Sequence, residues 1–488
     1  MQSLDKNLLK FLVFTFVILS ILHICYAVYA QRGFYLDGAF WFVSVLNNLS
    51  AGTFPFVYDE NHTRNFAVCL SQLPMVLAYG LFHIKSKIFL SYMFSLPLFV
   101  LPLIFMYWNY NLTKRTKQYG ILFWSIFSYC VVSLVIQIWS IAENIIASQI
   151  YFLLLNYLLA KIEYNKWDKT GIIFLLIMMF EIYEHTIIIG LLFFSVMLYF
   201  VFKEKNRCGI KIVIGIISAL ASLYNLVFCL NNISEHSDFR RFLIESTDYW
   251  RITGEFILFI SAVTVCLLIF NLITRKYGNK IFSIFNFAQV FLYAYLFYYM
   301  YSHIDKFLAP VVEGHVKTLP CYVDVLVILG IIIYHFLKFP PQTELIKKCL
   351  IPVLLCGITL TSWQMVNTYY WNKNLKYFMT ELKNYSQAVY VPEKHEVLSS
   401  FDNKDLRRYI WHCVYITTAI ALDNEYKIKT LPIHYQKEYE IGNLTYYEFI
   451  YPKLENEILN IPFNTEINIK NEFWDLSEFA DALEKYKK

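Results

Sequence analysis

Residues 11–64 read FLVFTFVILSILHICYAVYA followed by QRGFYLDGAFWFVSVLNNLSAGTFPFVYDENHTR. The first part, up to Ala30, is an apolar run of about 20 residues, the length that an α-helix needs to cross a bilayer. The stretch from Gln31 to Arg64 is polar and aromatic and precedes the next apolar run. Acids that lie at a membrane surface are more often functional than decorative. The pattern therefore predicts a membrane protein with its functional residues in this loop.

The composition extends this prediction to the rest of the chain. The sequence is 58% hydrophobic and 16% charged, whereas soluble domains carry about 25% charged residues. Many apolar runs of about 20 residues alternate with short polar stretches, which is typical of a polytopic membrane protein. The net charge of +5 fits lysines in cytoplasmic loops better than a nucleic-acid surface, so we expect no nucleic-acid partner.

The cysteines argue against a fold held by disulfides or zinc, and the N-terminal run argues against a cleaved signal peptide. The ten cysteines are scattered and show no CxxC spacing, so neither a disulfide framework nor a structural zinc site is expected. The run that ends in Val28-Tyr29-Ala30 is similar to a signal peptide, but it is long for one and further spans follow. We interpret it as a retained first helix with a cytoplasmic N-terminus.

The basic clusters between apolar runs set the predicted topology. Under the positive-inside rule they give about eleven transmembrane helices in an all-α polytopic bundle. Residues 66–84 contain a glutamine, a proline and a glycine, and we expect them to dip into the outer interface rather than cross. Residues 170–202 are too long for one span, and the acids in the middle predict a turn at the outer face.

We expect two domains. Residues 1–366 form the transmembrane domain with an extracytoplasmic loop at 31–65. Residues 367–488 have shorter apolar runs and more charges, and they predict a small α/β extracytoplasmic domain, with strands at 389–391 and 428–431.

Five short motifs resemble those of one enzyme superfamily. They are Tyr35-Leu36-Asp37-Gly38-Ala39-Phe40, the run 47–52 that follows it, the turn 141–144, Tyr183-Glu184-His185, and Lys306-Phe307-Leu308-Ala309-Pro310. In this order they resemble the GT-C superfamily of multi-pass glycosyltransferases. Gly38 replaces the second acid that is common there, His185 stands where many members carry a lysine, and Lys306 replaces an arginine.

The resemblance implies an activity. It implies a hexosyl- or pentosyltransferase that takes its sugar from a polyprenyl-phosphate carrier by direct displacement with inversion. The acceptor would be a cell-surface glycan, a lipid or a protein. We expect an integral membrane protein of a bacterial inner membrane, with the active site and C-terminus periplasmic; an organelle lumen is the alternative.

Asp37 is the candidate catalytic base. Sugar transfer needs a carboxylate that removes a proton from the acceptor hydroxyl while the anomeric carbon loses its phosphate carrier. The alternative is that Asp37 only caps the helix that is expected to start near Ala39.

The leaving phosphate requires cations near the membrane surface. The candidates for donor-phosphate binding are Arg64, His185, Arg240, Arg241 and Lys306. Arg240 and Arg241 are equally well explained as a solvated or lipid-headgroup pair.

Other acids at the outer ends of helices have candidate roles. Glu143 and Glu184 are expected to position the substrate, or alternatively to reach the interface and pair with neighbours. No cofactor is expected. A divalent cation is possible through Asp59, Glu60 and His62, since hard cations prefer several oxygen ligands.

Two rival functions remain open. A surface-polysaccharide polymerase or ligase would need dominant arginines in two large outer loops, and only the loop with Arg240 fits. A transporter or flippase would be expected to show inverted repeats and charges at mid-span, neither of which is visible in the sequence.

Overall fold

The chain is described from a computed structural model. The described residues are 2–34, 38–57, 63–134, 137, 143–202, 209–231, 324–333, 335–336, 343–384, 389–390, 420–423, 431–432, 439–441, 444–446, 454–455, 458–461 and 465–481.

Helices dominate the described chain. They are α1 (Gln2–Tyr29), η1 (Arg32–Phe34), α2 (Gly38–Ala51), α3 (Asn65–Gly80), α4 (Lys87–Thr116), α5 (Tyr119–Phe127), the π-helix η2 (Ser128–Ser133), α7 (Glu143–Leu159), α8 (Lys166–Met178), α9 (Thr186–Phe202), α10 (Gly209–Asn231), an unlabelled helix Asp324–Ile333 and α16 (Thr343–Asn384).

Short strands occur only near the C-terminal part of the described chain. They are β1 (Val389–Tyr390), β2 (Leu431–Pro432), β3 (Tyr439–Ile441), β4 (Leu444–Tyr446), β5 (Leu454–Glu455), β6 (Ile458–Ile461) and β7 (Thr465–Asn468). β1 and β2 pair in parallel, β3 and β4 pair antiparallel, and β5, β6 and β7 form an antiparallel sheet in that order.

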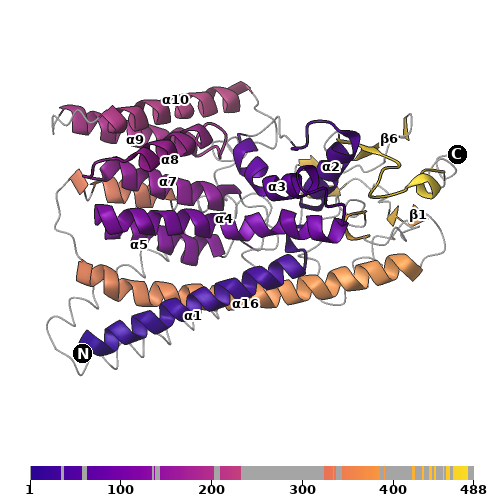
Figure 1. Ribbon diagram of the computed structural model, residues 1–488, viewed down its shortest axis with the longest axis horizontal. Coiled ribbons are helices and arrows are strands. Elements are labelled where there is room, and N and C mark those ends of the chain that lie inside the picture. The colour runs from indigo at the N-terminus through magenta and orange to yellow at the C-terminus, as the bar shows by residue number, and fades with distance from the viewer. Residues whose placement is uncertain are drawn as a thin grey trace.

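Four described helices are long and apolar enough to cross a membrane. They are Asn7–Tyr29 within α1, Lys87–Thr116, Gly209–Asn231, and Cys349–Lys373 within α16. The 42 residues of α16 span about 63 Å at 1.5 Å per residue, which exceeds the roughly 30 Å of a hydrocarbon core. α16 therefore extends beyond the bilayer, and α1 packs along it (Figure 1).

Helix α7 is the centre of the bundle. Every residue from Glu143 to Leu159 is buried. The polar side chains of Gln149 and Asn156 have hydrogen-bond partners inside the bundle, in α5 and α4. The helix packs against α4, α5, α8 and α9.

The C-terminal residues pack against one end of the bundle, which we call the loop end because α2 and α3 lie there (Figure 1). The backbone N–H of Asn468 donates to Oδ1 of Asn47 in α2 at 3.0 Å. Lys85, just before α4, forms an ion pair with Glu472 at 2.5 Å. Contacts from two separate segments therefore hold residues 465–481 beside the loop.

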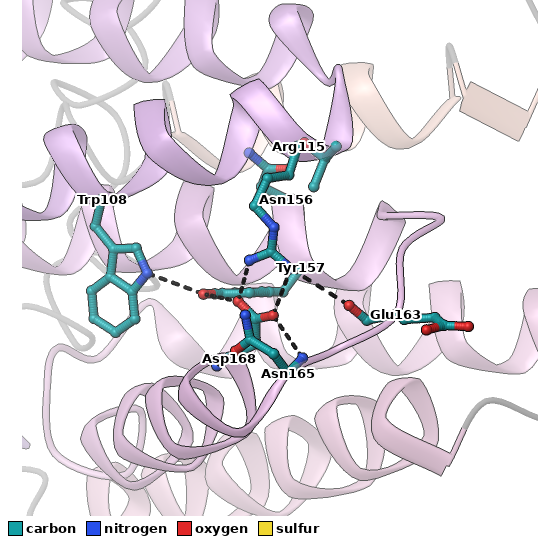
Figure 2. A network of polar contacts seen from close by, with 8 residues as sticks. Trp108, Arg115, Asn156, Tyr157, Glu163, Asn165 and Asp168 are labelled. Carbon is teal, nitrogen blue, oxygen red and sulfur yellow. Dashed lines mark hydrogen bonds and ion pairs between the residues drawn. The ribbon is translucent and has the colours of Figure 1, made fainter.

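The opposite end, where α4 ends and α7 turns into α8, is called the basic end. Helix α4 stops at Lys117, whose φ of 60° is left-handed. Arg115 in its last turn forms an ion pair with Asp168 in the first turn of α8 at 2.8 Å (Figure 2). This pair ties α4 to α8.

Several predictions can be compared with these elements. The expected helix after Asp37 is confirmed as α2, and residues 170–202 divide into two helices with the acids in the turn between them. The predicted helical membrane bundle is confirmed in its class, with four membrane-length helices among the described residues. The count of about eleven and the α/β character of the C-terminal part stay predictions, because residues 232–323 and much of 385–464 lie outside the described chain.

The structure bears on the predicted domain boundary at residue 366 and on the predicted interfacial segment 66–84. The boundary between residues 366 and 367 falls inside α16, which continues without a break to Asn384. In place of the predicted segment 66–84, the structure has α3, whose 16 residues run from Asn65 to Gly80. These are fewer than the roughly 20 of a full span. Whether α3 lies in the interface stays a prediction.

Candidate functional site: the buried Arg64–Glu184 pair

Two predicted site residues from distant parts of the chain meet in the structure. Arg64 is the residue directly before α3, and Glu184 lies in the turn between α8 and α9. Nε of Arg64 donates to Oε1 of Glu184 at 2.9 Å, and each residue is only 7% exposed. This buried ion pair joins the start of α3 to the turn between α8 and α9.

The turn that carries Glu184 is held on two sides. The backbone N–H of Phe66 in α3 donates to the carbonyl of Glu181 at 2.9 Å. From α10, the side-chain amide of Asn225 donates to the carbonyls of Met179 and Phe180 at 3.3 and 2.9 Å. Contacts from α3 and α10 therefore fix the backbone of the turn.

One aromatic ring lies over the arginine of the ion pair. The guanidinium carbon of Arg64 lies 4.6 Å from the centroid of the Tyr183 ring. Such a cation–π contact is favourable, and more so where water is excluded. The guanidinium is thus oriented by a carboxylate and a ring at once.

His185 lies next to the pair. Its ring makes edge-to-face contacts with Tyr151 and Tyr183, with centroids 4.9 and 5.1 Å apart. Neither ring nitrogen forms a hydrogen bond to a described residue, although the residue is only 9% exposed. Burial, with a smaller contribution from the Arg64 charge, lowers the pKa of His185 to about 3. The imidazole is therefore neutral near pH 7 and has one N–H donor.

Tyr151, on α7, connects His185 and the ion pair to the core of the bundle. The hydroxyls of Tyr151 and Thr186 are 2.5 Å apart. Glu143 is the first residue of the same helix and is 8% exposed. It lies eight positions before Tyr151, about 12 Å along a helix. The predicted role of Glu143 in positioning substrate stays a prediction.

The other predicted site residues lie outside the described residues. These are Asp37, Asp59, Glu60, His62, Arg240, Arg241 and Lys306. In the sequence, two of them adjoin described elements. Asp37 directly precedes Gly38, the first residue of α2, and His62 lies two positions before Arg64. Both interpretations of Asp37, as base and as helix cap, remain open.

Arg32 is a buried cation that was not among the residues predicted from the sequence. It lies in η1, is 1% exposed, and its guanidinium carbon is 5.7 Å from the Trp371 ring on α16. Trp371 also donates its indole N–H to the carbonyl of Ala30 at 3.0 Å. The available signal was an arginine directly after the first apolar run, five positions before Asp37.

Metal binding receives no support from the part of the chain that is described. No group of three or more His, Cys, Asp or Glu side chains there could hold an ion. The candidate Asp59, Glu60 and His62 lies outside that part.

Membrane-length helices around a buried core, with charged and aromatic side chains gathered in a turn, define a helical membrane protein. Comparison with protein-family models, with curated proteins and with solved structures finds no match for this chain.

Proposed function

We propose that this chain is a membrane glycosyltransferase that moves a sugar from a polyprenyl-phosphate carrier to an extracytoplasmic glycan, lipid or protein. The observation that supports it best is the buried Arg64–Glu184 pair with neutral His185 beside it. A buried ion pair is weak evidence for stability, because desolvation offsets much of the attraction. A permanently charged guanidinium in a dry, aromatic setting suits an anionic phosphate.

The proposed reaction divides the work among these groups. Asp37 removes the proton of the acceptor hydroxyl as its oxygen attacks the anomeric carbon. The bond from that carbon to the phosphate oxygen breaks, and the phosphate leaves with the electron pair. Arg64 stabilises this charge, and His185 donates an N–H to a phosphate oxygen.

Glu184 has a positioning role in this scheme, because it holds the guanidinium of Arg64 through Nε. Lys306, Arg240 and Arg241 are proposed as further phosphate ligands from later outer loops. The inverting outcome and the identity of the donor carrier come from the GT-C resemblance.

The test uses purified full-length protein, radiolabelled polyprenyl-phosphate sugars and a membrane lipid extract. We expect transfer by the wild type and a loss of about 10²–10⁴-fold for Asp37→Asn. Lys376→Gln, at an exposed position on α16, is the control and keeps full activity. Absence of transfer with every sugar carrier tried, or a fully active Asp37→Asn variant, contradicts the proposed mechanism.

Transport is a second candidate function because of one buried carboxyl, that of Asp324. Asp324 is fully buried, and its Oδ1 accepts a hydrogen bond from Ser128 at 2.7 Å. Ser128 follows the start of α5 by nine positions, about 14 Å of helix, which is near the middle of a roughly 30 Å core. A buried carboxyl at mid-membrane is typical of ion and proton pathways.

The two functions are separable with the same protein. Proteoliposomes loaded with buffer report transport as uptake of labelled substrate, and the extract assay reports transfer. A transporter loses uptake in Asp324→Asn and shows no transfer, whereas the glycosyltransferase shows transfer that depends on Asp37.

A further inference from the structure

The basic end of the bundle carries an excess of exposed positive charge. Two segments meet there, residues 114–117 at the end of α4 and residues 161–169 around the start of α8. They contribute the basic side chains of Lys114, Arg115, Lys117, Lys161, Lys166 and Lys169, and two acids, Glu163 and Asp168. The five lysines are all exposed.

One of the two acids is withdrawn from the surface. Figure 2 shows Arg115 reaching Asp168 with both terminal nitrogens, each 2.8 Å from a carboxylate oxygen. The backbone N–H of Asn165 donates to the same carboxylate at 2.9 Å. The Asp168 side chain is 6% exposed. Its charge is therefore matched by Arg115 and does not offset the lysines around it.

The same contacts make the start of α8 rigid. Asn165 caps the helix, since its side chain accepts from the backbone N–H of Asp168 at 2.8 Å, and the reciprocal bond completes a capping box. Beneath it, Tyr157 accepts from the indole of Trp108 at 3.0 Å and its hydroxyl reaches Asp168 at 3.4 Å (Figure 2). The exposed side chains of this turn are thus presented on a fixed frame.

Aromatic side chains lie beside the lysines. Trp167 is 83% exposed, between Lys166 and the buried Asp168. On α4, Tyr110 is exposed and lies 4.2 Å from the ammonium of Lys114. Tryptophan and tyrosine are enriched where a membrane meets water.

The residues that follow Trp167 along α8 indicate that this surface contacts lipid rather than a soluble partner. Ile173 and Ile177 on α8 are 56% and 52% exposed. Exposed apolar side chains on a membrane helix suit hydrocarbon, and Trp167 precedes Ile173 by six positions, about 9 Å along the helix. Such a position suits an aromatic residue at headgroup depth.

We propose that Lys114, Lys117, Lys161, Lys166, Lys169 and Trp167 form a binding surface for anionic phospholipid headgroups, which we call the lysine rim. Lysine ammonium groups attract the phosphates electrostatically, and the indole inserts between headgroups. The ion pair between Arg115 and the buried carboxylate of Asp168 positions the rim and does not itself bind lipid. This surface is independent of sugar transfer.

The test is preferential quenching of Trp167 fluorescence by brominated lipid. Full-length protein is reconstituted in equal amounts of phosphatidylglycerol and phosphatidylcholine, with bromine on the chains of only one lipid at a time. The difference in emission between the wild type and Trp167→Phe isolates the signal of Trp167. We expect brominated phosphatidylglycerol to quench this signal at least about twofold more than brominated phosphatidylcholine. Equal quenching by the two lipids overturns the proposal.

Two double variants show whether the rim lysines cause the preference. Lys166→Gln with Lys169→Gln removes two charges that flank Trp167, and we expect the preference to fall toward equality. Lys373→Gln with Lys376→Gln has the same spacing on α16, also at exposed positions, and should leave the preference unchanged. If both double variants reduce it equally, the effect is one of net charge and the assigned surface is wrong. Gel filtration before reconstitution confirms that each variant is folded.

Discussion

Arg64 and Glu184 are 120 positions apart in the chain, yet their side chains form a 2.9 Å ion pair in the interior of the protein. The pair joins the residue before α3 to the turn between α8 and α9. Because both side chains are only 8% exposed, removing one of them leaves the other as a buried charge that has lost this ion pair.

The first prediction concerns this pair. Glu184→Ala should lower stability by about 3–5 kcal/mol, the usual effect of removing one member of a buried pair. The double variant Arg64→Met with Glu184→Leu should recover much of the loss, because no isolated charge remains. Thermal unfolding in a neutral detergent measures both effects. Losses that simply add in the double variant contradict the coupling.

The second prediction concerns pH. The pKa of His185 is lowered to about 3 by burial and by Arg64, whereas the pKa of a histidine in the unfolded chain is about 6.5. Between these values the unfolded chain binds the proton and the folded chain does not, so stability decreases as pH falls. The slope contributed by His185 is about 1.4 kcal/mol per pH unit.

His185→Phe tests this slope, because it keeps the ring contacts with Tyr151 and Tyr183 and removes the titrating group. Unfolding midpoints between about pH 4 and pH 6.5 should change less with pH in the variant than in the wild type. Identical pH profiles for the two proteins would show that the histidine is not buried in neutral form.

The third prediction compares two lysines near the start of α4. Lys87 is buried, and its ammonium donates to the carbonyls of Ile420 and of Asp423, the latter at 2.9 Å. Lys85 pairs with Glu472, but its side chain is 68% exposed. Lys87→Met should weaken docking of the C-terminal segment by about 1.5–3 kcal/mol, and Lys85→Gln by less than about 1 kcal/mol.

Hydrogen exchange measures this docking. Lys87 also reaches the segment through the Trp474 ring, whose centroid is 5.8 Å from its ammonium. The amide of Asn468, which donates to Oδ1 of Asn47 on α2 at 3.0 Å, should exchange faster in Lys87→Met and nearly normally in Lys85→Gln. The reverse order would show that the exposed ion pair is the stronger attachment.

The fourth prediction concerns the close packing of α9 and α10. A Cβ added at Gly190 would lie 2.3 Å from the backbone oxygen of Ser218 and 2.9 Å from Cβ of Ser222. Gly190→Ala therefore forces the helices apart and should destabilise the protein by about 1–3 kcal/mol. Gly80→Ala is the matched control, since no described atom lies within 4 Å of its added Cβ. Equal thermal stability of the two variants contradicts this close approach.

Much of the local structure follows from the sequence. Apolar runs of membrane length identify α1, α4, α10 and α16, because a bilayer core has a fixed thickness. The acids in residues 170–202 identify the turn between α8 and α9, since charged side chains avoid the hydrocarbon.

The tertiary structure alone decided which of the candidate residues meet. Arg64 was one of several equivalent cations in the sequence, and only the packing of α3 against the α8–α9 turn gives it Glu184 and Tyr183 as partners. Arg32 has only its place after the first apolar run as a sequence signal, and Asp324 belongs to none of the motifs. Both became notable because segments from elsewhere in the chain bury them. Hydrophobic length and charge placement are properties of neighbouring residues, whereas burial and pairing of a charge depend on segments that are distant in sequence.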